Sequence, residues 1–355
     1  MRITAFQLIA MMAMAAATLR SQATSIPGTQ PPVTGPVYWS TTAPDCSSLA
    51  GESPVPITSA SGTVGYSCYV SGTFVWLAAG GGWSTAIRVA APASATIGVD
   101  YSFYDKSGNS LKLDRKSGGS TVVSGDDVNF ALSANQPAEI AVLGATSDAP
   151  KYLNTSAGTV YAVFYCPDAP TCGNVLPQLL YSAPPATPWS LGVPIAWDMA
   201  LATEWSAVGV DDGGAHRVSL AIYNEDIAPA SYTISVFDST GKMAGSGVTP
   251  SIPPLQSLPN GAYGEGGAYG AMLSDVVSTP LPSGPFKIIV EGGAIYSAVE
   301  VLQFNGPSGT ALQVGYDSLP SLASSDAIRL ARIRQSRVAS RSRPAFNALP
   351  IGEAK

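Results

Sequence analysis

The sequence predicts an all-β protein with two tandem antiparallel β-sandwich units, and three observations support this prediction. Residues 75–108 match residues 208–241 at a constant offset of 133, without a gap. Short runs in which apolar and polar residues alternate occur in both copies, as expected for strands that bury one face. No helical pattern of comparable strength occurs before residue 324. Turn residues between the runs favour antiparallel sandwiches over βαβ units.

The first 23 residues are predicted to be a signal peptide. A short basic start precedes a mostly apolar stretch at residues 3–19, and Ser21-Gln22-Ala23 offers small residues at the positions that a signal peptidase reads. Residues 15–17 offer an alternative cleavage site, and a transmembrane anchor is the competing interpretation of the apolar stretch. We therefore expect the mature protein to be secreted, periplasmic or located at the cell surface.

The remaining chain is predicted to contain five segments. They are a flexible leader at 24–37, a first β-sandwich unit at 38–182, a Pro-rich linker at 183–194, a second β-sandwich unit at 195–320 and a basic tail at 321–355. The leader is rich in Pro, Thr and Gly, and four prolines within eleven residues mark the linker.

Within each unit, the apolar runs predict strands in a definite order. The expected strands cover residues 66–70, 73–77, 83–89, 95–104, 140–143 and 159–165 in the first unit, and 217–223, 231–237, 286–290 and 294–302 in the second. A second match, between residues 158–161 and 293–296 at offset 135, predicts one more pair of equivalent strands.

Each copy of the repeat contains the same predicted turn. Asp105 and Asp238 occupy the first turn position, and Gly108 and Gly241 supply the positive φ at the last position. Because an apolar strand and an aromatic residue precede both aspartates, the chain resembles the tandem immunoglobulin-like β-sandwich domains of secreted bacterial proteins over residues 60–318. The resemblance implies a fold and no functional residue, since the antibody-type Cys–Trp–Cys spacing is absent.

Four cysteines suit an oxidising compartment. Of the three ways to pair them, we predict Cys46–Cys68 and Cys166–Cys172, because nearest-neighbour closure keeps each bridge within one segment. A metal site is the competing interpretation, but the chain has a single His and no Cys-x-x-Cys motif. No metal or other cofactor is therefore expected.

Charged residues make up 12% of the chain, about half the usual share, so no nucleic-acid partner is expected. Residues 24–320 contain 9 basic and 22 acidic side chains, whereas residues 321–355 contain 7 basic and 2 acidic ones. The arginines of this basic tail are Arg329, Arg332, Arg334, Arg337, Arg341 and Arg343. Ser325 can cap a helix over residues 326–341. The primary expectation is a solvated tail, and the alternatives are that it folds back onto the acidic body or binds an anionic surface such as a membrane.

No catalytic, cofactor or metal residue is assigned. His216 follows Asp211 and Asp212, which suggests either a Ser-His-Asp hydrolase or a Ca²⁺ loop, but the segment lacks a Gly-x-Ser-x-Gly elbow and a spaced series of oxygen ligands. We interpret it as a turn before a strand. Asp238 superficially resembles the Asp of an aspartic-protease loop, but the spacing to glycine is one residue too long.

Aromatic residues are the better candidates for partner binding. Tyr263 and Tyr269 occupy repeated Gly-Ala-Tyr-Gly motifs, which are typical of contact loops. Trp189, Trp197 and Trp205 recur every eight residues and suit either sugar stacking or packing between the units. The expected function is non-enzymatic extracellular interaction, adhesion or surface structure, with an unknown protein or glycan as partner. The alternatives are a carbohydrate-binding module and a secreted hydrolase with an unrecognised site.

Overall fold

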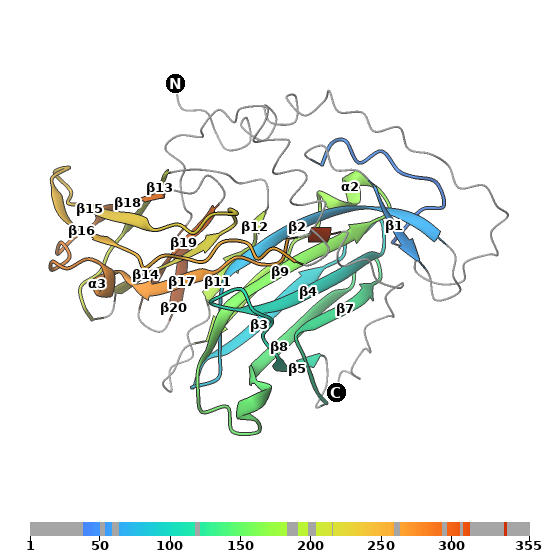
Figure 1. Cartoon of the computed structure of the whole chain (residues 1–355), viewed down its shortest axis with the longest axis horizontal. Helices are drawn as coiled ribbons and strands as arrows, with labels where there is room; N and C mark the ends of the chain where they lie inside the picture. Colours follow the sequence, from blue (N-terminus) through green and yellow to red (C-terminus); the bar gives the residue numbers. More distant parts are fainter. Residues whose placement is uncertain are drawn as a thin grey trace.

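The computed structural model describes residues 38–49, 54–58, 64–117, 121–182, 191–197, 204–214, 216–258, 263–292, 297–305, 308–312 and 337–338. Antiparallel strands dominate these residues, which confirms the all-β class (Figure 1). The named helical elements are single turns, namely η1 (Thr146–Asp148), α2 (Ala169–Cys172) and α3 (Leu273–Val276). The predicted signal peptide, the leader and most of the basic tail lie outside the described residues.

The first unit consists of two sheets. One has the order β1-β2-β9-β4-β7, with β12 also paired to β2, and the other has the order β11-β10-β3-β8-β5-β6. The strands are β1 (Val55–Thr58), β2 (Val64–Ala79), β3 (Ser84–Ala90), β4 (Ile97–Asp105), β5 (Leu113–Ser117), β6 (Val122–Gly125), β7 (Asp127–Leu132), β8 (Pro137–Ala145), β9 (Ser156–Cys166), β10 (Gln178–Ser182), β11 (Leu191–Pro194) and β12 (Ala196–Trp197).

The second unit has two four-stranded sheets, with the orders β13-β18-β15-β16 and β17-β14-β19-β20. Its strands are β13 (Glu204–Gly209), β14 (His216–Asn224), β15 (Tyr232–Phe237), β16 (Met243–Val248), β17 (Ala268–Met272), β18 (Phe286–Gly292), β19 (Ser297–Asn305) and β20 (Ser308–Leu312). In both units, alternate residues of the facing sheets point into a shared apolar core.

Seven strands have the same connectivity in the two units. In the first unit, β2-β9-β4-β7 form one layer and β10-β3-β8 lie in the other; in the second, the corresponding groups are β13-β18-β15-β16 and β19-β14-β17. In the constant-type immunoglobulin fold the first two strands share a sheet. Here the first two strands of this common set, β2 and β3 or β13 and β14, lie in different sheets. The strand order of both units therefore differs from that of the constant-type immunoglobulin fold.

The repeated turn is the same in both units. The Oδ1 atom of Asp105 accepts backbone N–H groups two and four residues later at 2.8 and 3.0 Å, and Asp238 does the same at 2.9 and 3.1 Å. Each aspartate carbonyl accepts the N–H of the turn glycine, and Gly108 and Gly241 have φ values of 81° and 83°. The residues matched at offset 133 therefore occupy equivalent positions.

The match at offset 135 is wrong. Residues 158–161 lie within β9, whose counterpart by strand pairing is β18. Because β18 ends at Gly292, the matched residues 293–296 follow that strand and lie outside the described residues. The described end of the predicted linker forms β11, which pairs with β10 of the first unit. The next strand, β12, lies in the predicted second unit but pairs with β2 of the first unit.

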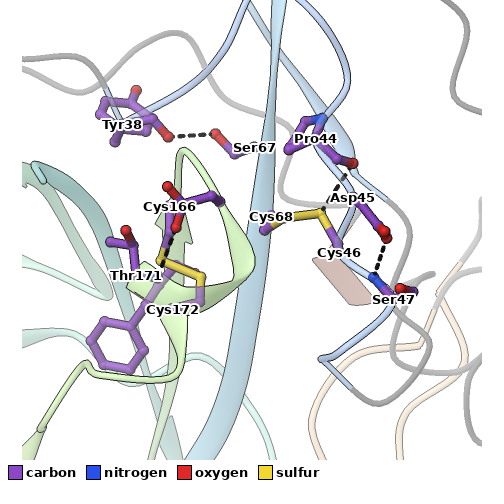
Figure 2. The surroundings of a disulfide bond; sticks show 12 residues. Tyr38, Pro44, Asp45, Cys46, Ser47, Ser67, Cys68, Cys166, Thr171 and Cys172 are labelled. Atoms are coloured by element: carbon purple, nitrogen blue, oxygen red, sulfur yellow. Dashed lines mark hydrogen bonds between the residues drawn. A yellow bond between two sulfur atoms is a disulfide. The ribbon is translucent and has the colours of Figure 1, made fainter. Parts of the chain in front are cut away.

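Both predicted disulfides, Cys46–Cys68 and Cys166–Cys172, are confirmed. Cys68 and Cys166 are direct neighbours across β2 and β9, so the two bridges lie close together in the first core, as Figure 2 shows. The shorter bridge closes a loop around α2, where Asp168 caps the helix by accepting the N–H of Thr171 at 2.8 Å.

Replacing both cysteines of the longer bridge, Cys46 and Cys68, by alanine should destabilise the protein more than replacing Cys166 and Cys172. The bridges span 22 and 6 residues, and restriction of the unfolded chain contributes about 3 and about 2 kcal/mol, respectively. Urea unfolding of the two double variants measures the difference. An equal loss, or a larger loss for the short bridge, would contradict this ranking.

Candidate functional site

The two units meet where β14, β17 and β19 of the second unit pack against β2 of the first. Val75 of β2 forms a buried cluster with Ala221, Tyr223 and Ala268. Leu302 and Phe304 of β19 belong to the core of the first unit. The junction therefore has a buried apolar centre, continuous with the core of the first unit.

The Gly-rich segment around Tyr263 and Tyr269 forms part of this junction. A side chain at Gly270 would collide with Trp76 of the first unit, and one at Gly267 would meet Pro253 and the carbonyl of Lys106. Glycine fits here because a Cβ atom would leave no room for Trp76 and the carbonyl of Lys106. The glycines of the second Gly-Ala-Tyr-Gly motif thus permit close packing between the units.

The first repeated turn lies at the same junction. The N–H of Ala268 donates to the carbonyl of Lys106 at 3.0 Å, and Gln256 donates to the carbonyl of Ser107 at 3.3 Å. A Cβ atom at Gly108 would lie 2.7 Å from the carbonyl oxygen of Glu265. At Gly241, the equivalent turn glycine of the second unit, a Cβ atom would have no described atom within 4 Å. The first turn is thus a contact between the units, and the second is not constrained in this way.

A buried arginine from the C-terminal region connects the two units. Arg337 is 1% exposed; its Nη1 lies 2.5 Å from Glu225 Oε1 and its Nη2 lies 2.6 Å from Glu265 Oε1. Nη2 also donates to the hydroxyl of Tyr223 at 3.2 Å. The guanidinium lies 4.0 Å from the ring centroid of Tyr161 in β9 of the first unit. We call Tyr161, Tyr223, Glu225 and Glu265 the arginine pocket.

The electrostatics of the arginine pocket keep its groups in complementary states. Burial raises the pKa of Tyr223 well above its usual value, although Arg337 offsets part of this effect. The phenol stays protonated and donates to Glu265 Oε2 at 2.5 Å. Burial alone would lower the pKa of Arg337, but Glu265 and the other pocket groups raise it overall. The guanidinium is therefore a permanent buried cation.

The prediction of a solvated basic tail is wrong for Arg337. Its burial against Glu225 and Glu265 corresponds to the fold-back alternative, in which the tail binds the acidic body. Val338 is also buried. The other arginines of the basic tail lie outside the described residues.

The outer face of the β2-β9-β4-β7 layer is covered by other parts of the chain. Tyr69, Tyr161, Val163 and Tyr165 point outward from it and are at most 3% exposed. Tyr38, Trp39 and Val338 pack against these residues, and Tyr38 is fixed by a 2.8 Å hydrogen bond from Ser67 to its carbonyl (Figure 2). Residues from both ends of the described chain thus cover the sheet. We call this surface the covered face.

The equivalent layer of the second unit is open to solvent at its edge strands, whereas Ser235 at its centre is 5% exposed. Its outer surface, which we call the open face, contains Glu204, Ser206, Val208, Lys287, Ile289, Glu291, Thr233, Ser235, Phe237, Met243, Ser246 and Val248. Val208, Met243 and Val248 are 60, 52 and 63% exposed. One row across all four strands contains Val208, Lys287, Phe237 and Met243, so exposed apolar side chains mark both edges of the face.

A shallow cleft of about 340 Å³ lies beside the loop that precedes β14, and Asp211, Asp212, Ser274 and Ser283 contribute to its lining. Asp211 accepts the N–H groups of Gly213 and Val218, both at 3.0 Å, and therefore shapes the loop. The hydroxyl of Ser274 accepts a 3.2 Å hydrogen bond from Arg217.

His216 contacts Asp212, with 2.8 Å between His216 Nδ1 and Asp212 Oδ2, and both side chains are half exposed. Hydrogen bonds from His216 and Gly214 lower the pKa of Asp212 below its usual value. Asp212 also accepts the backbone N–H of His216 at 3.0 Å, which fits the predicted turn before a strand.

The candidate aromatic residues whose side chains the structure describes, Trp205, Tyr263 and Tyr269, differ in their surroundings. Trp205 is 1% exposed and packs on Tyr232 in the second core, with 6.2 Å between ring centroids, which excludes stacking on a ligand in this conformation. Tyr269 is half-buried in β17, whereas Tyr263 lies in the preceding loop. Trp197 lies in β12, but its side chain, like all of Trp189, is outside the described residues.

Glu300 is a buried acid at the junction. It lies opposite Ala221 in the β14–β19 pair and close to the backbone of Val75 and to Tyr181 of the first unit. Burial raises the pKa of Glu300 to about 8, although the amide of Val75 partly offsets this shift. The sequence patterns identify neither Glu300 nor the arginine pocket. The one signal for the pocket is that its acidic residues stand near glycine or aromatic residues in the chain.

In the part of the chain that the structure describes, no group of His, Cys, Asp and Glu residues has a metal-binding arrangement, and no helix is long and apolar enough to cross a membrane. Comparisons with protein families, with curated proteins and with solved structures return no match.

Replacing Arg337 by alanine should lower the free energy of unfolding by about 3–5 kcal/mol, because two buried carboxylates lose their cation. The matched control is Arg88→Ala, since Arg88 pairs with Glu139 at 2.6 Å with both side chains at least half exposed. Such a surface pair contributes only about 0–1 kcal/mol. Urea unfolding compares the two variants, and similar losses would show that the arginine pocket contributes no more than a surface ion pair.

The stability of the protein should fall between pH 4.5 and about 8 because of Glu300. The folded state raises the pKa of this carboxyl from 4.5 to about 8, so it keeps a proton that the unfolded chain releases. The stabilisation is complete below pH 4.5 and is lost as the pH rises through 8, at up to about 1.4 kcal/mol per pH unit. Glu300→Gln should remove this slope, whereas Glu139→Gln at an exposed site should retain it; unfolding at pH 5, 7 and 9 tests both.

Proposed function

We propose that this protein is an exported, non-enzymatic protein with an interaction or surface-structure role, and that the open face is its contact surface. The observation that supports this proposal is the contrast between equivalent layers. The tyrosines of the covered face are at most 3% exposed, whereas Val208 and Val248 on the open face are 60 and 63% exposed. Exposed apolar side chains with polar neighbours on one face are typical of contact surfaces.

The composition of the open face supports binding to a macromolecule. Four strands present a flat surface on which apolar side chains alternate with hydroxyls and a few charges. Such a mixture suits a stable but soluble interface with an extracellular protein. Two disulfides support an oxidising destination and, together with the apolar N-terminus, the proposed signal peptide and export. The immunoglobulin-like relationship is proposed only at the level of sandwich architecture.

Substituting lysine for Val208 and Val248 should weaken binding to the surface of the producing cells at least tenfold, because charged side chains replace apolar contacts. The control carries lysine at Val122 and Val123 of β6, which are 44 and 55% exposed but lie in the other unit. Fluorescently labelled protein and intact cells give the binding curves.

Treatment of the cells distinguishes the partner class. Loss of binding after protease treatment supports a protein partner, and loss after periodate oxidation supports the carbohydrate-binding alternative. Unchanged binding by the open-face variant would contradict the assignment of this surface, and equal weakening by the control would attribute the effect to added charge alone.

A further inference from the structure

The arginine pocket is a built recognition site for a guanidinium group. Two carboxylates lie 2.5 and 2.6 Å from separate Nη atoms of Arg337, and the ring of Tyr161 lies 4.0 Å from the guanidinium. A planar cation with several N–H donors satisfies these contacts together, whereas a lysine ammonium cannot reproduce the fork or the stacking. The geometry therefore selects arginine specifically.

The parts of the pocket come from both units and are fixed independently of Arg337. Tyr161 is held in the β9 ladder of the first unit. Glu265 is 1% exposed and accepts a hydrogen bond from Tyr223, which is in turn held within β14. Asn224, which precedes Glu225, donates to the carbonyls of Ala228 and Ile252. The surrounding contacts thus hold the receptor groups in place.

The residues that occupy the pocket and its surroundings are an arginine, Arg337, and the apolar residue that follows it, Val338. Val338 packs with Tyr38, Trp39 and the outward tyrosines of the covered face, next to the Tyr161 ring that Arg337 contacts. A short peptide can reproduce this combination of one buried cation and one apolar contact.

We propose that the arginine pocket is a peptide-binding site for an arginine followed by an apolar residue. The C-terminal segment fills it in cis, and the pocket accepts the same segment from solution when Arg337 is absent. Binding closes the junction between the units, so occupancy of the site controls how firmly they are joined. This inference is independent of the open face.

The test uses the full-length Arg337→Ala chain and a synthetic peptide of residues 331–343, which contains Arg337 among four other arginines. Two control peptides carry Arg337→Ala or Arg341→Ala and have equal net charge. The unchanged peptide and the Arg341→Ala peptide should bind this chain and raise its Tm, whereas the Arg337→Ala peptide should bind at least tenfold more weakly. An Arg337→Lys peptide should also lose at least tenfold.

The wild-type chain, whose pocket is filled, should bind the unchanged peptide at least tenfold more weakly than the variant does. If the Arg337→Ala chain does not fold alone, its refolding yield with each peptide provides the same comparison. Equal binding or recovery with all peptides would indicate non-specific attraction of arginine to an acidic protein and would overturn the proposal. Absence of binding or recovery with every peptide would also overturn it.

Discussion

A single buried cation, Arg337, contacts both units. A guanidinium removed from water is strongly unfavourable unless carboxylates and further acceptors surround it. Arg337 meets this requirement only where Glu225 and Glu265 of the second unit face Tyr161 of the first. The carboxylates come from the second unit and the stacking ring from the first, so the complete set of contacts forms only when the units adopt this relative position. The apolar junction supplies the buried area between the units, and the contacts of Arg337 with both units favour one relative position.

Coverage by other parts of the chain explains why the equivalent layers have different surfaces. In the first unit, residues of both ends of the described chain lie over β9, and Tyr161, Val163 and Tyr165 are buried there. In the second unit, the corresponding strand β18 carries Lys287, Ile289 and Glu291 outward, a mixture that tolerates water. The connectivity is common to both units, but the outer face carries apolar residues where other parts of the chain cover it and a mixture of polar and apolar residues where it is exposed.

Local patterns predict much of the fold. Alternating runs identify most strands, and Asp105 and Asp238 mark equivalent turns because the Asp–Gly chemistry of a turn acts over four residues. The disulfides are predictable for a similar reason, since each bridge joins nearby positions in the chain. The equivalence of residues 158–161 with residues 293–296 fails because a four-residue match does not fix strand pairing.

Contacts between distant segments are not predictable from such patterns. The glycines near Tyr269 resemble a contact loop because their composition does not reveal that Trp76 lies against Gly270. Arg337 is indistinguishable in sequence from the other tail arginines, and Glu265 stands alone in a Gly-rich segment. Their pairing joins positions 72 residues apart, and only the folded junction brings them together.

The junction is important for the second unit because the second unit contains no disulfide. Both disulfides lie in the first unit, and all four cysteines of the chain are used there. The second unit therefore relies on its own core and on the junction, where Leu302 and Phe304 extend into the core of the first. Opening the junction would expose these residues and would separate Arg337, paired with Glu225 and Glu265, from the ring of Tyr161. Separation of the units thus carries both an apolar and an electrostatic cost, which favours cooperative unfolding of the two units.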